Sequence, residues 1–224
     1  MLAVVPKLTL SPREPSPEER EAEAHPSDQA IANGIAQGRE WAADALYSRV
    51  QPVVDQCLRR ILRSTGPDYD DLMQAAFERI ITALSRKPLG GKGDLRAWSA
   101  AVATHVALDN LRRKGRERRL FQWHTDADVS SSATSHSPTP YPSGQPCAEG
   151  RLEARSEVNR VQAILVNMKP AAAETLLLHD VLGYELAEVA QLTGVTLAAA
   201  QSRLVRSRRE FLRRARTGSP TVLR

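Results

Sequence analysis

The sequence predicts an all-α protein in which a flexible linker joins two small helical domains. Ala, Leu, Glu and Arg are abundant and β-branched runs are few, which favours helix over strand. Apolar residues recur with a helical period in two stretches, and a tract rich in Ser, Pro and Gly separates them. Apolar residues form 42% of the 224 positions but aromatic residues only 4%, so Leu, Val, Ala and Ile must fill both cores.

Composition divides the chain into a disordered extension, a first helical domain, a linker, a second helical domain and a disordered tail. We place these segments at residues 1–28, 29–120, 121–150, 151–216 and 217–224. The stretch "SPREPSPEEREAEAHPSD" holds almost no large apolar side chain that could offset the entropy lost on folding, so the extension is expected to be disordered.

The first domain begins with two segments of helical period. The stretch "ALYSRVQPVVDQCLRRILRS" supplies core positions and is expected to be interrupted at Pro52. The stretch "DYDDLMQAAFERIITAL" predicts a helix with one buried and one polar face. The predicted buried stripe is Met73, Phe77, Ile80, Ile81 and Leu84. The predicted polar face carries Asp71, Gln74 and Glu78.

A third segment of the first domain follows the Gly- and Pro-punctuated loop "SRKPLGGKGD". The stretch "LRAWSAAVATHVALDNLRRKGRERR" predicts one long helix that ends in a dense basic run. Its spacing places Trp98, Ala101, Val102 and His105 on one face.

The second domain is predicted to contain three helices. Pro170 suits the first turn of a helix that Gly183 ends, and its apolar residues are Leu176, Leu177, Leu178, Val181 and Leu182. The stretch "YELAEVAQLTG" predicts a short helix with Leu186, Val189 and Ala190 inward and Gly194 at its C-terminal turn. Thr196 is the predicted N-cap of the last helix.

The last two of these helices have the spacing of a helix-turn-helix. Ala190 and Ala200 let the helices approach, and Gly194 permits a left-handed turn. On the last helix, Leu197, Ala200, Leu204 and Phe211 are predicted to face inward, whereas Ser202, Arg206, Arg209 and Arg213 lie opposite them. An arginine stripe alone is more often a solvated helix face. On the second helix of a helix-turn-helix it predicts binding to DNA phosphates.

Net charge and cysteine usage limit the classes of protein to which this chain can belong. The formal charge of +5 is modest for a nucleic-acid binder, so its distribution matters more than its sum. Cys57 and Cys147 lie far apart and form no CxxC pair, which predicts a reduced intracellular protein. The start, "MLAVVPKLTL", is too short and too interrupted for a signal peptide or a membrane span, so we expect a cytoplasmic protein without membrane insertion.

No pattern typical of an enzyme is present. The sequence has no HExxH, no nucleophile elbow and no Gly-rich phosphate loop after a strand. The residues His124, His136 and Cys147 match the spacing of no closed zinc site. The cluster of Asp68, Asp70 and Asp71 is better explained by a helix N-terminus and partner docking. We therefore expect no catalytic activity, no metal and no cofactor.

From about residue 29 to 216, apart from the linker, the chain resembles bacterial sigma factors of the extracytoplasmic-function (ECF) type in the sigma-70 family. "DYDDLMQAAFERI" resembles the part of region two that docks on the β′ coiled coil of RNA polymerase. "LRAWSAAVATHVALDNLRRK" resembles the helix that melts and reads the minus-ten element. The stretch from "MKPAAAETLLLHDVLGYELAEVAQ" through "LTGVTLAAAQSRLVRSRREFLRR" resembles region four, which binds the minus-thirty-five element.

The resemblance implies three sets of binding residues. The core-polymerase set is Asp70, Asp71, Leu72, Gln74, Phe77 and Glu78, with Phe77 a core residue beneath that surface. The minus-ten DNA set is Lys92, Arg96, Trp98, His105, Asn110, Arg112, Arg113, Lys114 and Arg116. The minus-thirty-five DNA set is Thr196, Ala198, Ala199, Gln201, Ser202, Arg203, Arg206 and Arg209. The implied partners are core RNA polymerase, through its β′ and β subunits, promoter DNA and an anti-sigma factor.

Departures from the family pattern leave promoter preference open. His105 stands where the family often has asparagine, and Gln201 stands where the recognition helix usually has lysine. Lys169 replaces the first proline of the usual Leu-Pro-Pro entry. The alanines at 198 and 199 leave few side chains that can read bases. Target promoters, inducing signal and anti-sigma factor are therefore not predicted.

Two other functions remain open at this stage. A stand-alone helix-turn-helix regulator would bind duplex DNA without polymerase. An interaction protein, such as an anti-sigma or adaptor mimic, would use the basic helix to bind an acidic partner.

Overall fold

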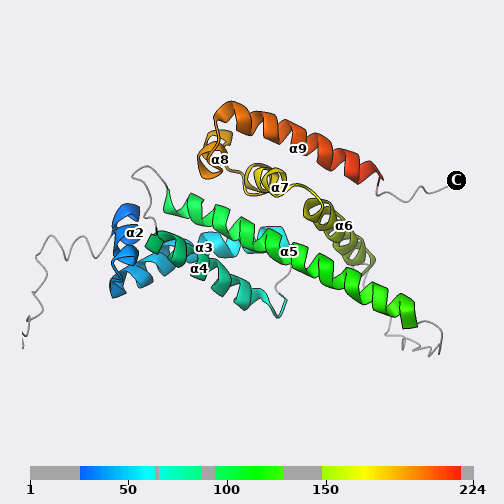
Figure 1. Ribbon diagram of the computed structural model, residues 1–224, viewed down its shortest axis with the longest axis horizontal. Coiled ribbons are helices and arrows are strands. Elements are labelled where there is room, and N and C mark those ends of the chain that lie inside the picture. Colours follow the sequence, from blue (N-terminus) through cyan, green and yellow to red (C-terminus); the bar gives the residue numbers. More distant parts are fainter. Residues whose placement is uncertain (1–25, 64–65, 87–93, 129–147, 218–224) are drawn as a thin grey trace, which may run out of the picture.

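The computed structural model describes residues 26–63, 66–86, 94–128 and 148–217. All regular elements in these residues are helices, and none of these residues lies in a strand (Figure 1). The predicted all-α class is therefore confirmed. Of the other residues, and of the side chains at 118–128 and 148–152, nothing is described, so the disorder expected in the extension and tail lies almost entirely outside the described residues.

The first domain is built from four helices. They are α2 (Asp28–Ala36), α3 (Glu40–Leu62), α4 (Tyr69–Arg86) and α5 (Leu95–Asp128). Asp94, just before α5, caps this helix, because its carboxylate accepts hydrogen bonds from the backbone N–H groups of Arg96 (2.8 Å) and Ala97 (3.3 Å). Asp28 ties three helices together, because it pairs with Arg49 of α3 and accepts a hydrogen bond from the Leu95 N–H at 3.0 Å.

The second domain consists of α6 (Ala148–Val166), α7 (Pro170–Leu176), the π turn η1 (Leu177–Val181), α8 (Leu186–Leu192) and α9 (Leu197–Thr217). Pro170 occupies the first turn of α7, as predicted. The expected single helix up to Gly183 is instead an α-helix that widens into a π turn, in which the Leu182 N–H reaches the Leu177 carbonyl at 2.9 Å.

Two helix boundaries differ from the prediction. α3 runs through Pro52, which lies on the solvent side of the helix, where the missing N–H leaves the buried face intact. α5 extends past the predicted end of the first domain to Asp128, and α6 begins at Ala148. Helix therefore covers both ends of the predicted linker, while residues 129–147 lie outside the described residues.

The buried face of α4 is rotated from the predicted stripe. Leu72, Ala76, Ile80 and Leu84 are buried, because α2 and α5 pack on that side. Met73 and Phe77 are half-buried. Ile81 is 40% exposed, so its predicted place in the core is wrong.

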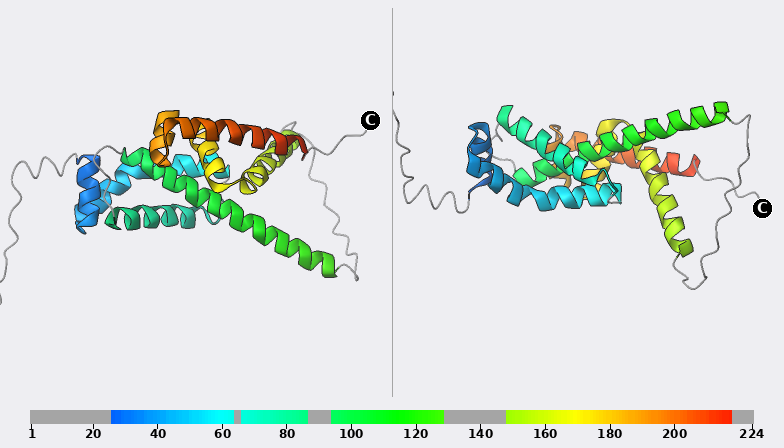
Figure 2. Two further views of the ribbon diagram at one scale, coloured as in Figure 1. Left: turned by 45° about the horizontal axis from the view of Figure 1, so that its top comes forward. Right: turned by 90° about the horizontal axis from the view of Figure 1, so that it is seen from below.

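The two domains share one core. Apolar residues of α6, α7, η1 and α9 join the cluster formed by α2 to α5. The side chain of Gln162 donates to the carbonyls of Ile61 (3.1 Å) and Leu62 (2.9 Å), which end α3 and have no partner within the helix. The views in Figure 2, together with the contacts between α5 and α7, place the second domain along one side of α5.

Candidate nucleic-acid and protein interfaces

The turn between α8 and α9 has the predicted helix-turn-helix geometry. Gly194 adopts φ = +65°, the left-handed region that favours glycine. The N–H of Val195 bonds to the carbonyl of Ala190 at 2.9 Å, and the N–H of Gly194 to that of Gln191 at 3.2 Å. These two bonds form a Schellman motif, which ends α8 and sets the direction of α9.

α9 begins where the sequence predicted. The Thr196 hydroxyl accepts a hydrogen bond from the Ala199 N–H at 3.2 Å, which confirms Thr196 as the N-cap. Ala190 is 4% exposed and Ala200 1% exposed, so small side chains do permit the close approach of the two helices.

The buried face of α9 is narrower than predicted. Ala200, Leu204 and Ser207 are buried and Phe211 is half-buried. Leu197 is 53% exposed, so its predicted inward position is wrong. At 3.6 residues per turn, Leu197 lies about 60° away from Ala200, at the edge of the covered face.

The arginines of α9 fall into two groups. Arg208 donates to the carboxylate of Asp180 in η1, with Nε 3.0 Å from Oδ2, and Arg214 pairs with Glu210 at 2.8 Å. Arg208 therefore joins α9 to η1, whereas the pair between Arg214 and Glu210 lies within α9. A second group, Arg206, Arg209 and Arg213, is exposed and forms no ion pair with any side chain in the described ranges.

A shallow hollow lies at the N-terminal half of α9. Gln201, Ser202, Val205 and Arg206 line it, and Val205 is 43% exposed. Ala198 and Ala199 are exposed and Arg203 is partly covered. Sequence reasoning missed Val205, although its spacing of four residues from Gln201 puts it on the same face.

The residues of α5 that are predicted to bind minus-ten DNA differ in their exposure to solvent. His105, Arg113 and Arg116 are exposed along one side, and Trp98 is half-buried beside them. Arg96 is exposed at the start of the helix. Lys92 lies outside the described residues.

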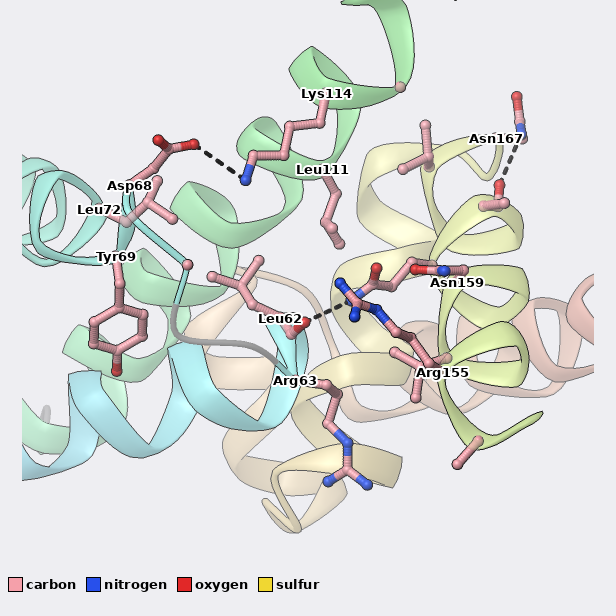
Figure 3. Close-up of a pocket in the computed structure, with 17 residues that line it drawn as sticks. Leu62, Arg63, Asp68, Tyr69, Leu72, Leu111, Lys114, Arg155, Asn159 and Asn167 are labelled. Carbon is pink, nitrogen blue, oxygen red and sulfur yellow. Dashed lines mark hydrogen bonds and ion pairs between the residues drawn. The ribbon is translucent and has the colours of Figure 1, made fainter. Parts of the chain in front are cut away.

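Three other members of this set are less available: Asn110 and Arg112 are covered, and Lys114 is paired with a carboxylate. Asn110 is 4% exposed, and neither atom of its amide has a hydrogen-bond partner in the described residues. Arg112 is largely covered and lies 3.7 Å from Asp109. The ammonium group of Lys114 lies 3.1 Å from the carboxylate of Asp68 (Figure 3).

An ion pair between α5 and α7 joins the two domains. The Nε2 atom of His105 on α5 lies 2.9 Å from Oε1 of Glu174 on α7. The Glu174 side chain is only 11% exposed. The hydrogen bond to Glu174 raises the pKa of His105 above its ordinary value of 6.5. Asp109 adds to the rise, while burial and Arg79 oppose it.

This pair predicts that folded-state stability falls as pH rises. Because the folded-state pKa of His105 is raised, its contribution is fully present below pH 6.5 and is lost as pH passes through the raised value. Thermal unfolding followed between pH 6 and pH 9 should show this loss, and His105→Gln should remove that component. An identical pH profile in the variant would contradict the prediction.

The polar face of α4 is a separate surface. Asp70, Asp71, Gln74 and Glu78 are all exposed and lie on one side of the helix, as predicted. Leu72, also assigned to the polymerase contact, is 9% exposed and lies beneath that face.

A cleft of about 710 Å³ lies between α6 and the first domain, where the end of α3, the start of α4 and part of α5 line it. In Figure 3, Leu72 and Leu111 line its first-domain wall, and Arg155 and Asn159 project from α6 on the opposite side. The Asp68–Lys114 pair lies at its edge.

Within the described ranges, no group of three or more His, Cys, Asp and Glu side chains is placed to hold a metal ion. His136 and Cys147 fall outside these ranges, as does the side chain of His124. In the same part of the chain, no helix has the length and apolar character required to cross a membrane.

Comparison with known families gives two matches in the expected order. Residues 46–117 match the model of Sigma-70 region 2, and residues 159–211 match the model of Sigma-70, region 4. The first match contains α4 and most of α5, and the second contains the helix-turn-helix.

Individual relatives agree with these matches. The chain is 29% identical over 190 residues to the ECF RNA polymerase sigma factor SigG of Mycobacterium tuberculosis, covering 78% of this chain and 50% of that protein. It is 29% identical over 168 residues to the RNA polymerase sigma factor CarQ of Myxococcus xanthus, covering 74% and 84%. The solved structure of CnrH in complex with the cytosolic domain of CnrY matches at 20% identity and a TM-score of 0.47, covering 86% of this chain and 99% of CnrH. The chain spans about half the length of its SigG relatives.

Proposed function

Because this chain belongs to the sigma-70 family and is an ECF-type sigma factor, we propose that it directs promoter-specific initiation by RNA polymerase. The observation that carries this proposal is the segregation of charge over the two family regions. An acidic face lies on α4, whereas exposed arginines line α5 in region two and α9 in region four.

Each surface has a partner that its chemistry fits. Carboxylates repel DNA phosphates, so the acidic face of α4, with Asp70, Asp71, Gln74 and Glu78, binds core polymerase through its β′ subunit. The exposed cations Arg113 and Arg116 follow the promoter backbone near the minus-ten element.

On α9, residues suited to reading bases and residues suited to contacting phosphates lie at different places along the helix. Gln201, Ser202 and Arg203 lie near the N-terminus, where a recognition helix approaches base edges in the major groove. Arg206 and Arg209 lie further along and contact phosphates of the minus-thirty-five element.

In this proposal the chain has no catalytic activity of its own, because the polymerase performs RNA synthesis. It acts in the bacterial cytoplasm, where the polymerase works. An anti-sigma factor is a further proposed partner. It would withhold the chain from the polymerase.

Binding both promoter elements at once requires the domains to separate. Minus-ten and minus-thirty-five elements are roughly 25 base pairs apart, or about 85 Å of DNA at 3.4 Å per base pair. In the structure His105 of region two touches Glu174 of region four. The holoenzyme therefore has to hold the chain in a more open arrangement than this one.

Asp71→Lys is expected to abolish core-polymerase binding. The change reverses one charge on the exposed face of α4, and like charges placed across an interface cost several kcal/mol. Core binding is measured by fluorescence anisotropy of the labelled chain, and function by transcription from a promoter library.

Asp44→Lys is the matched control, because Asp44 is an exposed carboxylate on α3 rather than on α4. Folded wild-type protein that gives no transcript above core polymerase alone would refute the proposal. A protein that binds duplex DNA tightly alone and tolerates Asp71→Lys would instead be a stand-alone regulator.

A further inference from the structure

Region four packs on the face of α5 that is predicted to read minus-ten DNA. The residues predicted to share that face are Trp98, Ala101, Val102 and His105. The elements α7, η1 and α8 of region four all contact α5 (Figure 1). Ala101 is only 5% exposed, because it forms one cluster with Leu178 of η1 and Val189 of α8, which are both fully buried. In this arrangement, protein therefore occupies the middle of the minus-ten face.

Polar contacts between the domains accompany this apolar cluster. The carboxylate of Glu174, whose side chain is 11% exposed, lies 2.9 Å from the ring of His105. The guanidinium group of Arg60 on α3 donates a hydrogen bond to the carbonyl of Val181 at 3.4 Å. His105 is also a position at which the chain departs from the family, which often has asparagine there. Its side chain is thus engaged by region four rather than free to meet a base.

Tyr184, in the turn between η1 and α8, lies at the same interface. Its side chain packs against the cluster around Leu178. Burial raises the pKa of Tyr184 to about 12, and Cys57 and Asp94 of the first domain add to the rise. Because the ring lies between the two domains, their separation should expose it to solvent.

The same arrangement leaves the other two proposed binding surfaces open. Asp70 and Asp71 on α4 are exposed, as are Arg206 and Arg209 on α9. Of the three surfaces, only the minus-ten face is covered by the rest of the chain. The packing of the two domains therefore affects one step of promoter recognition more than the others.

We propose that the packing of region four on α5 is autoinhibitory: it blocks minus-ten DNA in the free chain, and the pair of His105 and Glu174 holds it closed. This inference rests on the proposed function. Core polymerase binds first, through the uncovered face of α4, and region four leaves α5 when the holoenzyme opens the chain. Apparent affinity falls with the fraction of chains in the binding-competent form, so closure weakens minus-ten binding by the free chain.

Glu174→Gln is expected to strengthen binding of the free full-length chain to single-stranded DNA by about fivefold or more, because loss of the ion pair raises the open fraction. The probe is a fluorescein-labelled pool of random single-stranded oligonucleotides of about 20 nucleotides, followed by anisotropy. Glu174 lies on α7, outside both predicted DNA-binding sets, so a gain does not come from a new base contact. Glu153→Gln is the matched control, since it makes the same charge change at an exposed residue of α6 and should bind like wild type.

Hydroxyl-radical oxidation of Tyr184, measured by mass spectrometry, reports the opening itself. The oxidation rate should rise by at least about twofold in Glu174→Gln, and also in the wild-type chain once core polymerase is bound. His105→Gln breaks the same pair from the α5 side and should give the same rise in the free chain. Glu153→Gln should leave the rate unchanged.

The two measurements separate this inference from the proposed function. If oxidation of Tyr184 is the same in Glu174→Gln and wild type, the ion pair does not hold the domains together and the inference is wrong. If oxidation rises but DNA binding stays at the level of Glu153→Gln, region four does not block the DNA-binding face, and the inference is again wrong. Failure of the proposed function is seen independently, as the absence of a specific transcript from the wild-type holoenzyme. Should Glu174→Gln unfold the chain, oxidation in a folded His105→Gln variant decides the question.

Discussion

Joint replacement of Arg206 and Arg209 by alanine is expected to weaken promoter binding by roughly tenfold or more, across promoter sequences, and to flatten its salt dependence. Each exposed arginine that contacts a phosphate releases about one counterion on binding, so the slope of log affinity against log salt should fall by about two. Both guanidinium groups are exposed and unpaired with acidic side chains of the described residues, so the folded domain does not need their charges.

The measurement is the affinity of the holoenzyme for promoter DNA at several salt concentrations. Arg208→Ala is the matched control: the same residue type on the same helix, but bound to Asp180 of η1. It should lower stability slightly, since exposed ion pairs contribute at most about 1 kcal/mol, and leave the salt slope nearly unchanged. If the salt slope changes in Arg208→Ala but not in the double variant of Arg206 and Arg209, these two exposed arginines are merely solvated and do not contact phosphates.

Local features of the second domain could be predicted from the sequence because short-range rules determine them. A glycine is needed at the left-handed position 194, and a hydroxyl at position 196 caps the next helix. The helical period alone places Arg206, Arg209 and Arg213 away from the buried Ala200 and Leu204, and the structure confirms this.

The edges of helix faces could not be predicted in the same way. Periodicity gives the direction of an apolar face, but only the neighbouring helices decide how far burial extends around it. Leu197 and Ile81 lie at such edges and are exposed. Pro52 shows the converse case: a helix continues through proline when that position faces water.

Contacts between the domains left no signal in the sequence. His105 and Glu174 are far apart along the chain, and no local pattern pairs them. Within the second domain, no local pattern pairs Arg208 with Asp180 either, although this ion pair distinguishes Arg208 from the other exposed arginines of α9. Which positions bind polymerase or promoter therefore stays a prediction that binding experiments must test.

The interface between the domains also explains why one buried leucine should matter to the whole chain. Leu178 is fully buried in the π turn η1 and clusters with Ala101 of α5 and Val189 of α8. Because α5 belongs to region two and α8 to region four, this side chain lies where the two regions meet.

Leu178→Ala is therefore expected to lower the free energy of unfolding by about 2–5 kcal/mol, since it removes buried methyl groups and leaves a cavity. Val181→Ala, in the same turn, should cost less than about 0.5 kcal/mol, because Val181 is 39% exposed. Urea unfolding of both variants measures the difference. Equal midpoints would mean that Leu178 is not packed between α5 and α8 in solution, and the shared core would then not hold the two domains together.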